Sequence, residues 1–136
     1  IKKDDSYIES LWRRKLSDSG HIFGINRQYL SDREKEKIET IYKDVDVMIT
    51  HVNPSLDKEH TDERFREQET TGFFTFDGSK YLKEGSMKYW IFGHSHINTE
   101  FEVHGEQCIS NQMGYPSERD YGDLTRIKSI AIRKNT

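Results

Sequence analysis

Two short apolar runs, each followed by histidine, constrain the fold of this 136-residue chain more than any other feature. The run at 89–92 is followed by a glycine and then by His94 and His96, and the run at 45–50 is followed by His51. Short runs rich in β-branched and aromatic residues that stop at a turn signal are typical of buried strands. The sequence therefore predicts two strands whose carboxyl ends both carry histidine.

Histidine side chains at the ends of strands are candidate metal ligands. Neutral imidazole is the commonest nitrogen ligand for divalent metals, and two residues at i and i+2 of extended backbone can point to one side. In open α/β sheets, ligands bind at the edge formed by the carboxyl ends of the strands. We therefore regard His51, His94 and His96 as one candidate site. The alternatives are a surface turn that carries two unrelated histidines and, at His51, a loop histidine that only makes hydrogen bonds.

The remaining segments indicate an α/β fold in a single domain. Capping boxes that begin at Ser6 and Ser31 predict two amphipathic helices, and the second leads by a short connection into the strand at 45–50. A helix that feeds a buried strand in this way is half of a layered α/β unit. Further along the chain, the pattern predicts a short helix at 79–83, a hairpin of 99–103 with 107–110, a turn at His104-Gly105, and a final strand at 127–132.

The segment from 56 to 70 is crowded with charges of both signs. Such a stretch is usually a solvated loop or an exposed helix. Because it follows His51 directly, it is also a candidate cover for the site, in which Arg64 and Arg66 would contact phosphate oxygens. His60 is expected to be solvated, and 71–76 is an apolar docking segment.

Composition limits the class of protein. Only 32% of the residues are hydrophobic and 33% are charged, which is a lean supply for a closed core and fits a lobe that packs on another lobe. The formal net charge of −3 excludes the overall basic character of a nucleic-acid binder, although a local basic groove stays open. The single Cys108 favours a reducing compartment, and we expect a cytoplasmic location. No apolar run approaches the ~18 residues of a membrane span.

Three segments together resemble the C-terminal half of the calcineurin-like metallophosphoesterases. They are Thr50-His51-x-x-Pro54, Gly93-His94-Ser95-His96 after an aromatic strand, and 111–118 with its Asn-x-x-Gly-Tyr-Pro pattern. The resemblance implies an α/β sandwich of two sheets flanked by helices. It also implies a centre of two divalent metals (Mn, Fe, Zn or Ni), in which His51 and His94 bind one metal and His96 the other. The implied reaction is hydrolysis of a phosphomonoester or phosphodiester, on a small molecule or nucleotide, by metal-bound hydroxide.

The motifs of the family's N-terminal half are not found in this sequence. Neither 18–21 nor 122–126 matches the spacing of the family's Asp-x-His or Gly-Asp-x-x-Asp motif, and there is no Asn-His dipeptide. Because the chain also begins at Ile1, we expect residues 1–136 to be a C-terminal lobe that is inactive alone, completed by a lobe in the same or another chain. The remaining alternatives are a non-catalytic module that binds a metal or phospho-ligand, and a structural domain. Asn53 and Asn98 are candidate outer-shell partners of the histidines.

Overall fold

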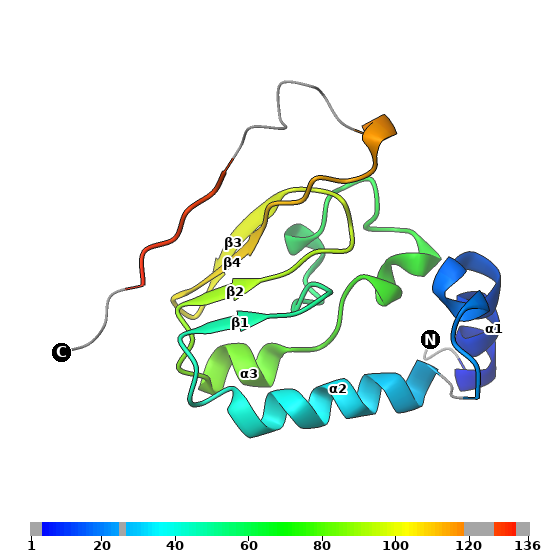
Figure 1. Ribbon diagram of the computed structural model, residues 1–136, viewed down its shortest axis with the longest axis horizontal. Coiled ribbons are helices and arrows are strands. Elements are labelled where there is room, and N and C mark those ends of the chain that lie inside the picture. The colour runs from blue at the N-terminus through cyan, green and yellow to red at the C-terminus, as the bar shows by residue number, and fades with distance from the viewer. Residues whose placement is uncertain (1–3, 25–26, 119–126, 133–136) are drawn as a thin grey trace.

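The protein has a mixed α/β fold. The computed structural model describes residues 4–24, 27–118 and 127–132, and within these ranges it contains three α-helices and one four-stranded sheet (Figure 1). The helices are α1 (Asp5–Lys15), α2 (Arg27–Ile41) and α3 (Ser79–Glu84), and the strands are β1 (Val47–Ile49), β2 (Tyr89–Ile91), β3 (Thr99–Val103) and β4 (Glu106–Ser110). The α/β class, the short helix before β2 and both histidine-bearing strands are confirmed.

The sheet brings three strand ends to one edge. Its order is β1-β2-β4-β3, with β1, β2 and β4 parallel and β3 antiparallel to β4. The residues that follow β1, β2 and β4 therefore leave the sheet at the same side. The predicted hairpin of β3 and β4 is confirmed, and its two-residue turn places His104 at φ 52° and Gly105 at φ 86°, since a tight hairpin turn of this kind favours positive φ at both positions.

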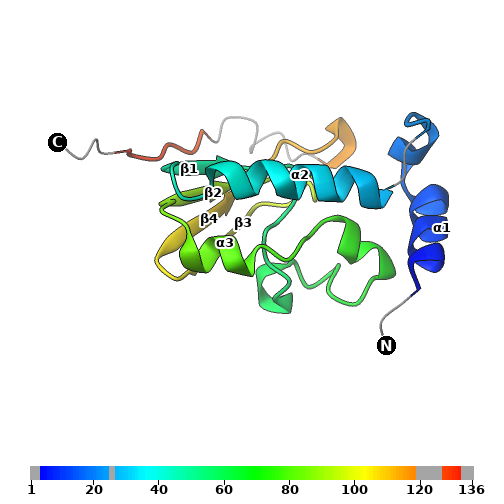
Figure 2. The same ribbon diagram turned by 90° about the horizontal axis from the view of Figure 1, so that it is seen from below.

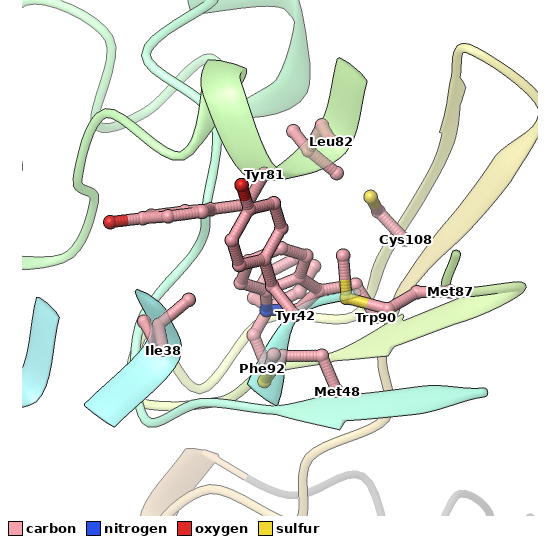
Figure 3. Close-up of a cluster of buried hydrophobic side chains, with 9 residues drawn as sticks. All are labelled: Ile38, Tyr42, Met48, Tyr81, Leu82, Met87, Trp90, Phe92 and Cys108. Atoms are coloured by element: carbon pink, nitrogen blue, oxygen red, sulfur yellow. The ribbon is translucent and has the colours of Figure 1, made fainter. Parts of the chain in front are cut away.

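One face of the sheet carries the core. Met48, Trp90 and Cys108 are in register across β1, β2 and β4, and Trp90 and Cys108 are 0% exposed. Figure 3 shows how residues from α2, α3 and their flanks pack over this row, together with Phe92 at the end of β2: Ile38, Tyr42, Tyr81, Leu82 and Met87. Helices α2 and α3 lie next to each other along the sheet, whereas α1 stands at the far end of α2 (Figure 2). The core therefore fixes the strands from which the histidines emerge.

Cys108 belongs to this core and carries no reactive thiol. Burial raises the pKa of the Cys108 thiol to about 12, with a smaller contribution from the charge of Glu106. A thiol that stays protonated at neutral pH is neither a nucleophile nor a metal ligand. We therefore assign Cys108 a packing role only.

The two predicted helix starts are wrong. Helix α1 begins at Asp5 with Asp4 as its N-cap, and the Asp4 carboxylate accepts from the Ser6 backbone N–H at 3.4 Å. Helix α2 begins at Arg27, so Ser31 lies inside it. Arginine, glutamine and leucine are good helix formers, and they extend α2 past the capping-box pattern.

The predicted strand at 127–132 is also wrong. These residues form no regular structure, and Ile127 is 94% exposed. Their apolar alternation is typical of a strand, but a strand also needs backbone hydrogen bonds to a neighbouring strand. In the part of the chain that the structure describes, this segment pairs with no strand, and its Ala131 carbonyl accepts from the Tyr89 hydroxyl at 3.5 Å. No helix in the described part of the chain has the length and apolar character required to cross a membrane.

Replacing Glu106 with glutamine is expected to stabilise the protein at high pH. Glu106 is 4% exposed, and burial raises the pKa of its carboxyl group from 4.5 to about 7. Below pH 4.5 both the folded and unfolded states are protonated. As the pH rises from 4.5 to 7 the unfolded state loses its proton first, so the wild type loses about 3 kcal/mol of stability, at about 1.4 kcal/mol per pKa unit.

Chemical denaturation of wild type and Glu106→Gln at two pH values measures this effect. We expect nearly equal stabilities at pH 4 and an advantage of about 2–3 kcal/mol for the variant at pH 8. An advantage that does not change with pH would mean that ionisation of Glu106 is not its cause.

Candidate functional site

The predicted histidines meet in one pocket. His51 follows β1, His94 and His96 follow β2, and all three line a pocket of about 510 Å³ at the carboxyl edge of these strands. The backbones of the two strand ends are joined directly, because the Gly93 N–H donates to the His51 carbonyl at 3.1 Å. The parallel pairing of β1 and β2 thus accounts for the meeting of residues 43 positions apart in the sequence.

His51 and His94 form a close pair of rings. Their ring centroids are 4.4 Å apart, at an interplanar angle of 45°. His94 also stacks on Phe74, with centroids 4.5 Å apart and planes at 25°. Phe74 belongs to the segment 71–76 that the sequence predicted to dock, and its ring helps hold the His94 imidazole in place.

The backbone at His94 and His96 is left-handed. Their φ angles are 73° and 58°, a region that costs a residue with a Cβ atom roughly 1–2 kcal/mol. At His104 a two-residue hairpin turn favours such a conformation, but His94 and His96 lie in no such turn. The expectation of extended backbone between the two histidines is therefore wrong. Strain of this kind clusters at functional sites.

Gln112 holds the loop that carries His96. Its Oε1 accepts from the His96 backbone N–H at 3.0 Å, and its Nε2 donates to Ser110 Oγ at 2.7 Å and to Ser95 Oγ and the Ile97 carbonyl at 3.0 Å each. Sequence reasoning assigned Gln112 no role. The available signal was its position two residues after β4, the third parallel strand.

The predicted outer-shell asparagines have other partners. Asn98 Oδ1 accepts from the Gln112 backbone N–H at 2.6 Å. Asn53 donates to the His60 carbonyl and accepts from the Ser55 N–H, both at 2.9 Å. These two residues brace the loops around the pocket.

Glu118 is a partner of His96 that the sequence did not reveal. Its Oε2 lies 2.9 Å from His96 Nδ1 and 2.6 Å from the Tyr115 backbone nitrogen. The N–H of Tyr115 lowers the pKa of Glu118 most, and the bond to His96 lowers it further. The Tyr115 ring meets His96 edge-on at 4.5 Å. Because Nδ1 is occupied by Glu118, Nε2 is the His96 nitrogen left for a ligand.

Replacing Glu118 with glutamine is expected to weaken divalent metal binding about 10- to 100-fold. Carboxylates that bond the second nitrogen of a ligating histidine orient the ring and raise its basicity, and their loss has effects of this size. Titration with Zn²⁺ or Mn²⁺ measures the change. Glu102→Gln, on the exposed face of β3, is the matched control and should bind like the wild type. Equal metal affinities of both variants would show that Glu118 does not contribute to metal binding.

The charged segment covers the pocket, but not through its arginines. Thr61, Asp62 and Phe65 line the pocket, whereas neither Arg64 nor Arg66 is among the lining residues. Arg64 Nε donates to Asp62 Oδ1 at 2.8 Å and lowers the pKa of that carboxyl group. Arg66 Nε donates to the Thr61 carbonyl at 2.8 Å. The structure therefore places both predicted substrate-binding arginines beside the pocket wall.

His60 also lines the pocket. The sequence predicts a solvated side chain at this position, but His60 is half-buried.

The end of β1 is bonded to the core. Trp90 Nε1 donates to Thr50 Oγ1 at 2.8 Å, and Thr50 Oγ1 donates to the Val52 carbonyl at 2.7 Å. This chain of bonds ties the end of β1, and with it His51, to the core.

The donor atoms suit a divalent metal in type, and the described residues provide only part of a ligand set. Two imidazoles in contact, with a third in the same pocket, match the nitrogen ligands preferred by Zn, Mn, Fe or Ni. Among the described residues, no group of three or more His, Cys, Asp or Glu side chains is arranged to hold one metal ion. A complete centre therefore requires donors beyond these.

No family model, curated protein or solved structure matches this chain. The described residues define a mixed α/β fold with a histidine-lined pocket at the carboxyl edge of its parallel strands. Any function has to be argued from this pocket.

Proposed function

We propose that this chain supplies the histidine ligands of the metal centre in a calcineurin-like metallophosphoesterase, which hydrolyses a phosphomonoester or phosphodiester. The observation that carries the proposal is the meeting of His51, His94 and His96 in one pocket at adjacent strand ends. The strained backbone at His94 and His96 supports it further, because a structural loop would gain stability from glycine or asparagine at these positions.

Each pocket residue has a task in this proposal. His51 and His94 hold one metal and His96 holds the other, with Glu118 fixing the ring of His96. Two bound divalent cations would neutralise phosphoryl oxygens and lower the pKa of water, which is the chemistry such a group supplies. Phe65, Phe74 and Tyr115 line the same pocket and keep bulk water from part of it.

The missing ligands are proposed to come from another segment. The pocket carboxylates Asp62 and Glu118 are already engaged by Arg64 and His96, so bridging carboxylates must be provided from outside this set. Ile49 on β1 is 72% exposed and lies on the face of the sheet opposite the buried Met48. A second sheet packed on that face would cover Ile49 and complete the sandwich. That lobe lies in the same or in another polypeptide.

Metal content and turnover of a chromogenic phosphodiester, measured in parallel on this chain and on the full product of its gene, test the proposal. We expect about two metals per molecule and turnover from the full product. The chain alone should carry at most one metal and show little or no turnover. The absence of metal and turnover from both would refute the proposal, and rapid metal-dependent turnover by the chain alone would refute the need for further ligands.

A second candidate is a non-catalytic module that binds a single metal or a phosphorylated ligand. It is favoured by the engagement of both pocket carboxylates, Asp62 in an ion pair with Arg64 and Glu118 in a hydrogen bond with His96, because no free carboxylate among the described pocket residues is left to bridge two metals. Metal binding by the full product without turnover of any phosphoester would select this candidate.

A further inference from the structure

His60 is a fourth histidine of the pocket, and it is held differently from the other three. It ends a short 3-10 helix, Lys58–His60, and its ring stacks flat on Phe101, with centroids 4.0 Å apart and planes at 2°. Its Nδ1 lies 2.8 Å from Ser55 Oγ. The loop beneath it is braced by the buried Asn53, which bonds both the His60 carbonyl and the Ser55 N–H.

The bonds of Ser55 determine which nitrogen of His60 carries the proton. Ser55 is buried, and its Oγ accepts from the Asp57 backbone N–H at 3.1 Å. Within the described residues, His60 Nδ1 is the acceptor available to the hydroxyl proton. If Nδ1 donated instead, this buried proton would have no partner, at a cost of about 1–3 kcal/mol. Ser55 therefore donates to Nδ1, and the neutral ring carries its proton on Nε2.

We propose that the Nε2–H of His60 is a hydrogen-bond donor to an anionic oxygen of the ligand in this pocket, and in the proposed phosphoesterase to a phosphoryl oxygen. His60 lines the pocket, and its Nε2 has no hydrogen-bond partner among the described residues. The ring is fixed on three sides, by Ser55, by Phe101 and by its own braced loop. A donor fixed in advance binds an anion without the entropic cost of ordering a side chain.

This assignment also explains why the charged segment covers the pocket without directing its arginines inward. A neutral donor binds one oxygen of an anion and leaves the positive charge of the site to the metals. The phosphoryl identity of the anion rests on the proposed function, whereas the tautomer of His60 does not. The two can therefore be tested separately.

Nitrogen-15 NMR of the full 136-residue chain reads the tautomer of His60 directly. We expect the Nε2–H form in the wild type at pH 8, and a mixture of both forms in Ser55→Ala. The Nδ1–H form in the wild type would overturn the proposal, whatever the chain binds.

An NMR titration with inorganic phosphate, with and without Mn²⁺, measures the donor's contribution. Loss of a hydrogen bond to a charged group should weaken phosphate binding about 10- to 100-fold in His60→Phe, which keeps an aromatic ring to stack on Phe101. His60→Gln keeps an N–H donor and should lose less. His21→Gln changes an exposed histidine that does not line the pocket and is the matched control.

Metal titration of the same samples separates the two proposals. If His60→Phe binds metal normally and phosphate more weakly, the donor role is supported. If it binds phosphate like the wild type, or if the wild type binds no phosphate at all, the donor role is overturned. If neither the wild-type chain nor the full product of its gene binds metal, the proposed function fails, and the tautomer and the metal-free phosphate titration still decide the role of His60.

Discussion

Replacing Trp90 with alanine is expected to lower the free energy of unfolding by about 3–5 kcal/mol. Trp90 is 0% exposed at the centre of the core, between Met48 on β1 and Cys108 on β4, and it faces residues of α2 and α3. Removing the indole leaves a cavity between β1, β4, α2 and α3, and these four elements cannot all move inward to fill it. A domain of this size has about 5–15 kcal/mol of stability, so the variant should be partly unfolded at 37 °C.

Trp90→Phe separates packing from the hydrogen bond. It keeps most of the buried area but removes the N–H that donates to Thr50 Oγ1. We expect a loss of about 1–2 kcal/mol from the hydrogen bond and the small cavity together. Because Thr50 precedes His51, this variant should also broaden the NMR signals of the His51 ring. Urea denaturation and NMR of both variants measure these effects, and a loss below 1 kcal/mol in Trp90→Ala would contradict the assigned core.

The sequence predicted those parts of the fold that local patterns determine. Strands β1 and β2 were recognised because each is a short apolar run that stops at polar or glycine residues. The hairpin of β3 and β4 was recognised because alternation and a turn at His104-Gly105 occur within a few residues. Once the strands are parallel neighbours, the meeting of His51 with His94 follows from topology.

The parts that were missed depend on contacts between distant residues. Glu118 reaches His96 across 22 positions, and Gln112 reaches the His96 backbone across 16 positions. No local sequence pattern around either residue predicts a contact with His96. The prediction of a solvated His60 was wrong for the same reason, because the ring that covers His60 is Phe101 on the distant strand β3. The strand predicted at 127–132 shows the converse, since a good local pattern forms no strand unless its backbone pairs with a neighbouring strand.

Removing the His94 ring is expected to abolish binding of the metal that His94 shares with His51. Loss of an outer-shell partner already weakens metal binding 10- to 100-fold, so loss of a ligand should weaken it by more than about 100-fold. The choice of variant matters, because His94 has a φ of 73° and alanine would keep the backbone strain. His94→Gly removes the ring and the strain together, and calorimetric titration with Zn²⁺ or Mn²⁺ measures the result.

A second left-handed histidine on the same sheet is the control for this experiment. His104 has a φ of 52° in the β3–β4 turn and is exposed, so His104→Gly relieves comparable strain far from the pocket. We expect His104→Gly to bind metal like the wild type and to gain up to about 1 kcal/mol of stability. In His94→Gly the relief of strain is offset by lost contacts with His51 and Phe74, so its stability should change little.

The comparison of these two glycine variants tests whether the His94 ring binds metal at a position whose backbone conformation favours glycine. If His94→Gly keeps its stability and loses the metal, the imidazole of His94 serves metal binding rather than stability. If His94→Gly keeps both its stability and its metal affinity, then His94 is no ligand. The pocket would then have to bind metal through His51 and His96 alone. If it loses stability while His104→Gly gains it, the stack of His51, His94 and Phe74 is a structural element. Such a result would favour the structural-domain alternative over the metal centre.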